Sequence, residues 1–323
     1  MRFLELGNTG FCVSQAALGG WAPDRTVWSP AHDELFVRGV ELALERGINF
    51  FDTAECYGDG YSETLMGKAL AGRRREVYLA SKVWFDHNKK EDAIKACEGS
   101  LKRLQTDYLD VYYIHYPDPA GKIPVEETME AMLSLQKRGL IRTIGVSNFT
   151  FTQLKSVCSM GRIDVIQPGY SLLWRTIDRE IRPYCVENHI SIVPYSPTAM
   201  GILTGKYDKE FKLPENDDRN GTFLYAKEYF PVCVELSEKL KPVAEKYNVT
   251  CGQLAIGWLR YQEGITSILL GGKTPEQIRQ NIDSFDLEIE SGDLEYLDRI
   301  SKEAVVKLPY WTGFFKDLAL PMD

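Results

Sequence analysis

Short apolar runs alternate with longer amphipathic segments along the whole chain. The runs are rich in β-branched and aromatic residues and predict eight strands, at 13–20, 48–51, 77–83, 109–115, 141–147, 163–167, 190–196 and 265–270. Between and after them, apolar residues recur at helical spacing and predict helices within 33–47, 62–72, 91–105, 125–139, 151–161, 178–189, 226–263 and 275–285. Several of these segments end in glycine, as helix C-caps do. The order is therefore strand then helix throughout.

This order predicts a parallel sheet covered by helices, either closed as a barrel or open and doubly wound. Eight repeats favour the closed (β/α)8 TIM barrel. An open dinucleotide-binding fold would carry G-x-G-x-x-G after its first strand, and the segment LGGWAPDR at 18–25 lacks that motif. We expect one barrel domain over residues 1–323, with an N-terminal β-hairpin and a C-terminal tail over the barrel.

Composition narrows the function classes. The chain has 323 residues, of which 44% are hydrophobic and 26% charged, as in ordinary globular proteins. A net charge of -8 gives no attraction to nucleic acid or anionic lipid, and we find neither a signal peptide nor a membrane-spanning run. The 7 cysteines form no C-x-x-C pair, and the 4 histidines show no metal-ligand spacing. We expect a cytoplasmic protein without a metal, a nucleic-acid partner or a membrane partner.

Polar residues end several predicted strands, which is where barrels carry their chemistry. Asp52, Lys82 and His115 end the second, third and fourth strands, and Tyr57 follows Asp52 in a glycine-flanked loop. Taken singly, each has an ordinary interpretation. Asp52 could form a turn, Lys82 could extend its ammonium to solvent, and His115 and Tyr57 could be packed rings. Together the four residues could transfer a proton to or from a substrate. A buried Lys82 ammonium would bring the pKa of Tyr57 down from its usual value near 10, and Asp52 would keep that ammonium charged and oriented. His115 could hydrogen-bond the reacting oxygen.

The segments that carry these four residues resemble the aldo-keto reductase family. They are GINFFDTAECYGDG, ASKVW and DVYYIHYPD, and the similarity continues through IRTIGVSNF, IDVIQPGYSLLWR, VPYSPTAMGILTGKY and SILLGGKTPEQIRQNI. The resemblance thus covers essentially the whole barrel. It implies hydride transfer between a nicotinamide cofactor and a small carbonyl or alcohol substrate. Tyr57 would be the general acid, Lys82 and Asp52 would tune it, and His115 would orient the carbonyl.

The resemblance also implies where the cofactor binds. The nicotinamide carboxamide would be held by Ser147, Asn148 and Gln167, and Tyr195 would stack on the ring. Contacts with the pyrophosphate would come from a small-residue loop and nearby cations, namely Ser196, Gly201, Leu203, Lys206 and Arg219.

The adenosine end would lie on a glycine-rich turn that opens a helix, with Gly271, Lys273, Gln277, Gln280 and Asn281 as its contacts. Aldose-reductase-like relatives place an arginine for the 2′-phosphate of NADPH where this chain has Gln277. The glutamine pattern resembles instead the branch that contains potassium-channel β subunits and related bacterial reductases. Lys273 can meet the phosphate, whereas Gln280 and Asn281 suit adenine. We therefore expect NADP(H), with NAD(H) as the alternative.

Aromatic residues after strand ends predict a substrate pocket lined by Trp21, Trp84, Phe85 and Tyr116, although aromatics in such places are also common core filler. The insertion APDRTVWSPAH at 22–32 and the tail at 307–323 could shape its mouth, and the tail could dock on the barrel or on a partner subunit. The oligomeric state, monomer or homo-oligomer, stays open.

Two other functions remain to be weighed. A nicotinamide-bound regulatory subunit would use the same scaffold, and the complete set of four residues argues against it. A Schiff-base aldolase would use Lys82 as its nucleophile but would not need the cofactor segments.

Overall fold

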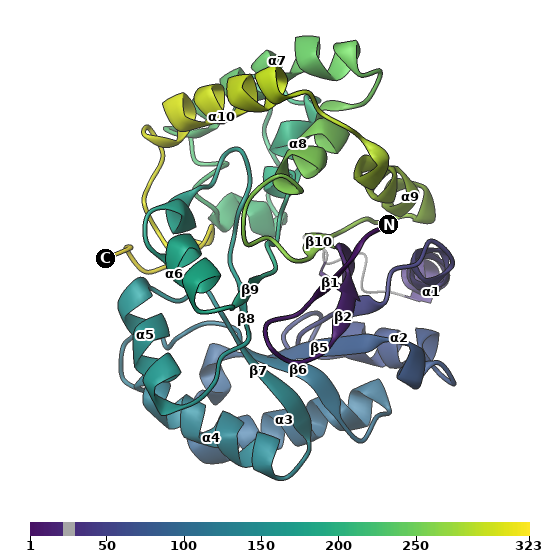
Figure 1. Cartoon of the computed structure of the whole chain (residues 1–323), viewed down its shortest axis with the longest axis vertical. Helices are drawn as coiled ribbons and strands as arrows, with labels where there is room; N and C mark the ends of the chain where they lie inside the picture. The colour runs from purple at the N-terminus through teal and green to yellow at the C-terminus, as the bar shows by residue number, and fades with distance from the viewer. Residues whose placement is uncertain (22–29) are drawn as a thin grey trace.

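A closed parallel barrel forms the centre of the protein. The computed structural model describes residues 1–21 and 30–323, and its eight-stranded sheet has the order β10-β3-β4-β5-β6-β7-β8-β9 (Figure 1). The strands are β3 (Ala16–Gly19), β4 (Phe50–Asp52), β5 (Tyr78–Val83), β6 (Leu109–Ile114), β7 (Ile141–Ser147), β8 (Val165–Gln167), β9 (Ser191–Ile192) and β10 (Ile268–Leu270). The first and last strands of this order meet, because Leu269 N donates to Pro194 O at 3.0 Å and Ile192 N donates to Gly264 O at 3.2 Å. The predicted (β/α)8 barrel is confirmed.

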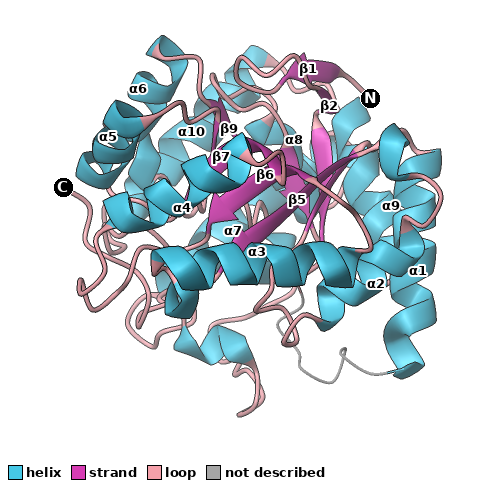
Figure 2. Cartoon of the chain, turned by 90° about the horizontal axis from the view of Figure 1, so that it is seen from below, coloured by secondary structure: helices cyan, strands magenta, loops and turns pink. Residues whose placement is uncertain are grey.

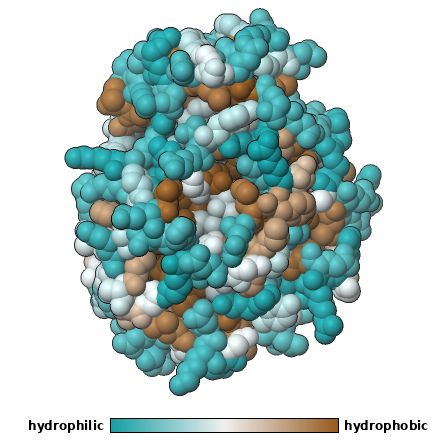
Figure 3. All heavy atoms as spheres, viewed as in Figure 1, coloured by the Kyte–Doolittle hydropathy of each residue, from teal (hydrophilic) through white to brown (hydrophobic). Residues whose placement is uncertain are grey.

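An N-terminal hairpin of β1 (Phe3–Glu5) and β2 (Cys12–Ser14) closes one end of the barrel. Its apolar residues Leu6, Phe11 and Val13 pack in one cluster with the side chains that fill the barrel interior. Figure 2 shows the hairpin at one end of the strands, opposite the loops that follow the strand carboxyl ends. Figure 3 views the hairpin end, which is largely hydrophilic with apolar residues near its centre and between the outer helices. The hairpin therefore closes this end of the barrel, and a catalytic site is expected at the opposite end.

Ten α-helices surround the sheet within the described residues. They are α1 (Pro30–Glu45), α2 (Tyr61–Ala69), α3 (Lys90–Leu104), α4 (Val125–Lys137), α5 (Phe151–Met160), α6 (Ile181–Glu187), α7 (Phe230–Lys246), α8 (Cys251–Leu259), α9 (Pro275–Asp283) and α10 (Ser291–Val305). None of these helices is long and apolar enough to cross a membrane.

Two helix predictions need correction. The segment 226–263 holds two helices, because Asn248 has a left-handed φ of 53° and the Thr250 capping box starts α8. Helix α10 was not predicted, although Leu294, Leu297 and Ile300 recur at helical spacing.

Strand β9 is also shorter than predicted. Only Ser191–Ile192 of the expected 190–196 pairs as a strand, and Pro194, which has no N–H to donate, lies two residues further on.

The C-terminal tail docks on the barrel, as one of the two predicted alternatives. Phe223 N donates to Phe314 O at 2.9 Å, and Lys316 N donates to Gly221 O at 3.0 Å. The Phe314 side chain is fully buried. Residues 22–29 of the predicted mouth-forming insertion lie outside the described residues.

Candidate active site

A buried ion pair forms the base of the candidate site. Asp52 is the last residue of β4, and Lys82 lies near the end of the neighbouring strand β5. Lys82 Nζ donates to Asp52 Oδ1 and to Thr53 O, the latter at 2.7 Å, and its side chain is 0% exposed. Burial raises the pKa of Asp52, while the charge of Lys82 opposes that shift. The strand register thus gives the lysine a fixed place and two oxygen partners.

The second oxygen of the same carboxylate is also occupied. Gln167, the last residue of β8, donates from Nε2 to Asp52 Oδ2 at 2.8 Å. The two residues lie 115 positions apart in the chain and reach each other across the barrel. Asp52 therefore joins the ion pair to the group of polar residues at the ends of β7 and β8.

Tyr57 reaches the ion pair from the loop after β4. Its hydroxyl lies 3.4 Å from Lys82 Nζ, and Tyr57 N donates to Ala54 O at 3.1 Å within the turn. The residue as a whole is only partly buried. The hydroxyl therefore faces the buried ammonium while the ring reaches the rim of the site.

The expected effect of Lys82 on Tyr57 needs correction. Burial raises the pKa of Tyr57 well above its usual value, and the negative charge of Asp52 raises it further. The charge of Lys82, which is paired with Asp52, does not outweigh these two effects. Tyr57 is thus held protonated, which is the state that a general acid needs before it reacts.

His115 follows β6 and lies among aromatic rings. The centroid of its ring is 5.7 Å from that of Tyr57, 5.0 Å from that of Trp84 and 5.2 Å from that of Tyr116. Burial and the positive charge of Lys82 lower the pKa of His115 well below its usual value. The imidazole is therefore neutral at pH 7 and can donate one hydrogen bond from a single nitrogen.

All four of the residues expected at the nicotinamide form a hydrogen-bonded group beside the ion pair. Asn148 donates from Nδ2 to Ser147 Oγ at 3.0 Å and to His115 O at 3.0 Å. Tyr195 donates from its hydroxyl to Asn148 Oδ1 at 2.7 Å. Ser147 donates to Gln167 O at 2.5 Å. The structure thus brings Ser147, Asn148, Gln167 and Tyr195 together.

The loop expected at the pyrophosphate has a backbone of unusual conformation. Ser196, Ala199 and Met200 have φ values of 54°, 50° and 55°, and Gly201 has 96°. Positive φ is uncommon for residues with a side chain, and it turns successive peptide groups toward one side of a loop.

Cations lie next to that loop. Arg219 donates from Nη1 to Met200 O at 3.2 Å and is held by Asp217 through both carboxylate oxygens. Lys206 is exposed, whereas Leu203 is fully buried and can offer only its backbone.

The turn expected at the adenosine lies at the start of α9. Thr274 caps the helix by accepting from Gln277 N at 3.3 Å, and Lys273 N donates to Gln277 Oε1 at 2.9 Å. Asn281 donates from Nδ2 to Gly271 O at 2.8 Å. Gln277 therefore closes the turn. Gln280 lies one helical turn further along, on the exposed side, and donates to Glu276 at 3.0 Å.

The comparisons with known proteins show the family of this chain. The sequence model of the Aldo/keto reductase family matches residues 16–302. The chain is also 35% identical over 289 residues to Aldo-keto reductase YhdN of Bacillus subtilis (strain 168), which covers 86% of this chain and 87% of the relative. The chain belongs to the aldo-keto reductase family.

Other members of the family extend the comparison. This aldo-keto reductase is 30% identical over 315 residues to the NADH-specific methylglyoxal reductase of Escherichia coli (strain K12), covering 91% of this chain and 96% of that one. An aldo-keto reductase from Klebsiella pneumoniae, solved in complex with NADPH, has a TM-score of 0.74 and 28% identity, over 93% of this chain and 95% of that chain.

The predicted aromatic pocket of this aldo-keto reductase is only partly assembled. Trp84 meets Tyr116 at 5.5 Å and Phe85 at 4.9 Å between ring centroids, and Trp84 and Tyr116 lie beside His115. Tyr116 is buried against Trp84 and His115. Trp21 lies instead against Phe315 of the tail, at 6.3 Å.

Sequence reasoning missed two supports of this site. Phe314 packs edge-on against Tyr195, with ring centroids 5.4 Å apart. Glu55 accepts from Trp84 N at 2.6 Å and so ties the Tyr57 loop to the loop after β5. The aromatic sequence YWTGFF in the tail could have indicated the first contact, but no local signal marks the second.

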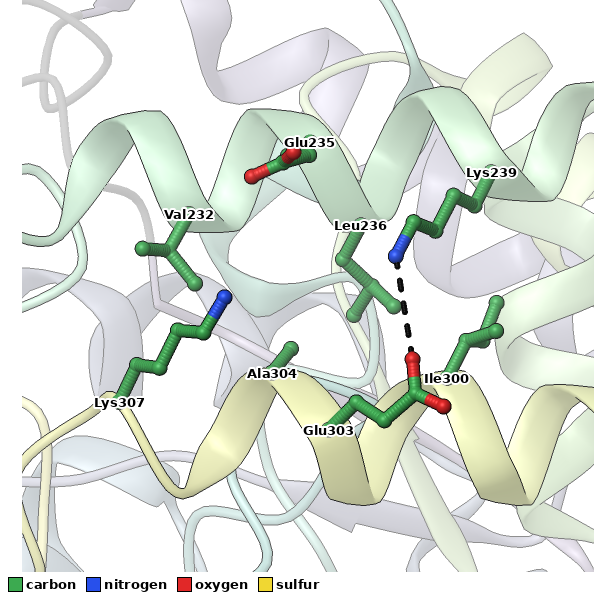
Figure 4. Close-up of a pocket in the computed structure, with 8 residues that line it drawn as sticks. All are labelled: Val232, Glu235, Leu236, Lys239, Ile300, Glu303, Ala304 and Lys307. Atoms are coloured by element: carbon green, nitrogen blue, oxygen red, sulfur yellow. Dashed lines mark ion pairs between the residues drawn. The ribbon is translucent and has the colours of Figure 1, made fainter.

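A small hollow on the outer surface has no part in this site. It holds about 50 Å³ between α7 and α10, and Figure 4 shows Lys239 and Glu303 paired across it at 3.9 Å. It is too small for a carbonyl substrate and lies in the outer helical layer. The described residues also contain no group of three His, Cys, Asp or Glu side chains placed to hold a metal ion.

Proposed function

We propose that this aldo-keto reductase reduces a small aldehyde or ketone to an alcohol, or runs the reverse reaction, with NADPH as its preferred cofactor. The observation that carries the proposal is the Tyr57 hydroxyl 3.4 Å from Lys82 Nζ, with that ammonium held by Asp52 in a buried pair. A protonated phenol beside a fixed positive charge is suited to donate a proton to a carbonyl oxygen.

The four residues have distinct roles in this proposal. Tyr57 gives its proton to the carbonyl oxygen, and the phenolate that remains is stabilised by Lys82. Asp52 keeps Lys82 charged. His115, neutral and beside Tyr57, donates a hydrogen bond to the same oxygen and orients it. The charge that develops on oxygen therefore meets donors that are already in place.

The polar groups around the site fit a nicotinamide dinucleotide. Ser147, Asn148 and Gln167 offer the hydroxyl and amide groups that a carboxamide can bind, and Tyr195 presents an aromatic ring. Lys206, Arg219 and Lys273 supply positive charge near the loop at 196–201 and the turn at 271–274, where phosphates would lie. When bound, the cofactor supplies the hydride.

The preference for NADPH rests on charge at the adenosine end. Lys273 follows the glycine pair that opens α9, so its ammonium is within reach of a 2′-phosphate. The NADPH-bound Klebsiella pneumoniae structure supports this choice. The NADH-specific Escherichia coli relative makes NADH the alternative.

The structure disfavours a Schiff-base role for Lys82. A lysine nucleophile must lose its proton, whereas this ammonium donates to two oxygens and is fully buried. We therefore expect no borohydride-trapped adduct on Lys82.

The test is a fluorescence-quenching titration with NADPH and NADH, followed by turnover assays on a panel of carbonyl compounds that includes 4-nitrobenzaldehyde. We expect tighter binding of NADPH and consumption of it with at least one carbonyl. Tight binding without turnover on any compound would favour the regulatory subunit, and absence of binding to both cofactors would overturn the proposal.

A further inference from the structure

The loop that carries Tyr57 also places a thiol against His115. Cys56 Sγ lies 3.7 Å from His115 Nδ1, which is hydrogen-bonding distance for sulfur. Among the described residues this is the one polar contact found for the imidazole ring, because its other close neighbours are the rings of Tyr57, Trp84 and Tyr116. The thiol is therefore the group that meets Nδ1.

The backbone fixes the position of this thiol. On one side, Glu55 Oε1 accepts from Trp84 N at 2.6 Å. On the other side, Tyr57 N donates to Ala54 O at 3.1 Å and Ser62 N donates to Tyr57 O at 3.2 Å. Cys56 thus lies between Glu55 and Tyr57, and the hydrogen bonds of these two neighbours hold the turn in place. This turn directs the Cys56 side chain toward His115.

The protonation states limit the hydrogen bond to two directions: the thiol donates to Nδ1, or Nδ1–H donates to the sulfur. Burial raises the pKa of the Cys56 thiol, so it keeps its proton at neutral pH. The pKa of His115 is lowered by burial and by the charge of Lys82, so the ring carries a single proton. In a neutral imidazole one nitrogen donates and the other accepts. A thiol that donates to Nδ1 therefore requires the ring proton to be on Nε2.

We propose that Cys56 is a positioning residue of the reaction: its thiol donates to Nδ1 of His115 and keeps the ring proton on Nε2, from which His115 hydrogen-bonds the carbonyl oxygen. This inference rests on the proposed function, in which His115 orients the substrate. The other tautomer would turn a lone pair toward the carbonyl oxygen, and the two lone pairs would repel each other. Holding the tautomer thus keeps His115 ready as a donor.

The experiment compares Cys56→Ala with Cys56→Ser in the full chain. Alanine removes the donor, whereas serine restores an O–H in the same place. Nitrogen-15 NMR of the labelled imidazole rings reads the tautomer directly, with His115→Asn used to identify the His115 signals among the 4 histidines. We expect the Nε2–H form in the native protein and in Cys56→Ser, and exchange between both tautomers in Cys56→Ala.

Kinetics with NADPH and 4-nitrobenzaldehyde provide the second measurement. For Cys56→Ala we expect kcat to fall about threefold to tenfold, the range expected for loss of one ordinary hydrogen bond. The Kd for NADPH should not change, because the contact of Cys56 is with His115 and not with the residues expected to hold the cofactor. Cys56→Ser should recover most of the lost kcat. The control is Cys12→Ala, since Cys12 is exposed on the hairpin at the other end of the barrel.

Three results would overturn the inference. They are an unchanged Nε2–H tautomer in Cys56→Ala, an unchanged kcat in that variant, and a serine variant as impaired as the alanine one. If the native protein shows no turnover, the proposed function has failed, and the nitrogen spectra alone then decide whether the thiol sets the tautomer.

Discussion

Replacement of Tyr57 by phenylalanine separates catalysis from folding in this structure. The substitution removes one hydroxyl and leaves the ring that packs near His115. Within the part of the chain that the structure describes, the hydroxyl makes one long hydrogen bond, 3.4 Å to Lys82 Nζ. A hydrogen bond of this kind contributes at most about 0.5–1 kcal/mol to stability, so the variant should unfold close to the native protein.

The kinetic effect should be far larger. A positioned general acid contributes about 10²–10⁴-fold to rate, which corresponds to roughly 2.7–5.4 kcal/mol of transition-state free energy at 1.36 kcal/mol per decade. We therefore expect kcat for carbonyl reduction to fall by that factor. The Kd for NADPH should stay within about twofold, because the residues expected to hold the cofactor lie at other strand ends.

The measurements are NADPH consumption, fluorescence titration of the cofactor and thermal unfolding. The matched control is Tyr112→Phe, because Tyr112 is a fully buried tyrosine of β6 that packs in the outer core between sheet and helices. The control should keep its activity. A Tyr57→Phe variant that retains more than about a tenth of native kcat would refute the role of general acid, and so would a parallel loss of cofactor binding.

Three further perturbations test other parts of the structure. Lys82→Met leaves Asp52 buried without its cation and should cost about 3–5 kcal/mol in urea unfolding, with part of that recovered when Asp52→Asn is added; full stability of the single variant would contradict the pairing. The pKa of His115 is lowered in the folded state, so below about pH 6.5 the unfolded chain binds the extra proton first. Stability should therefore fall with acid by up to about 1.4 kcal/mol per pH unit, and this slope should be smaller in His115→Gln. Phe314→Ala empties a fully buried site against Tyr195 and should cost about 3–5 kcal/mol and weaken NADPH binding, whereas unchanged binding would show that the tail does not support Tyr195.

Much of the candidate site could be predicted from local pattern and topology. Asp52, Lys82 and His115 each end a short apolar run, and the rule that parallel strands place their carboxyl ends together is enough to make them neighbours. The register of β4, β5 and β6 confirms that placement. The spacing of Tyr57 from Asp52 fits one short loop. These features depend on short stretches of sequence and on one well-established fold.

The features that were missed depend on packing between distant segments. The break between α7 and α8 is set by single residues at a turn, and the contact of Phe314 with Tyr195 is set by the path of the tail. The direction of the Tyr57 pKa shift is set first by burial and then by the charge of Asp52, and both depend on the folded structure. Spacing alone places charges near each other but does not say which of them is already paired.

Asp52 has a wider role than the one assigned to it from sequence, where it only kept Lys82 charged. Its side chain is buried, so each carboxylate oxygen needs a donor, and the donors are Lys82 on one oxygen and Gln167 on the other. A carboxylate held at both oxygens cannot rotate, so the position of Lys82 Nζ is fixed relative to β8 as well as to β4. Gln167 also belongs to the group expected at the carboxamide. A shift of that amide would therefore reach the ammonium beside Tyr57 through a single carboxylate, and would couple the residues expected at the cofactor to the proposed proton donor.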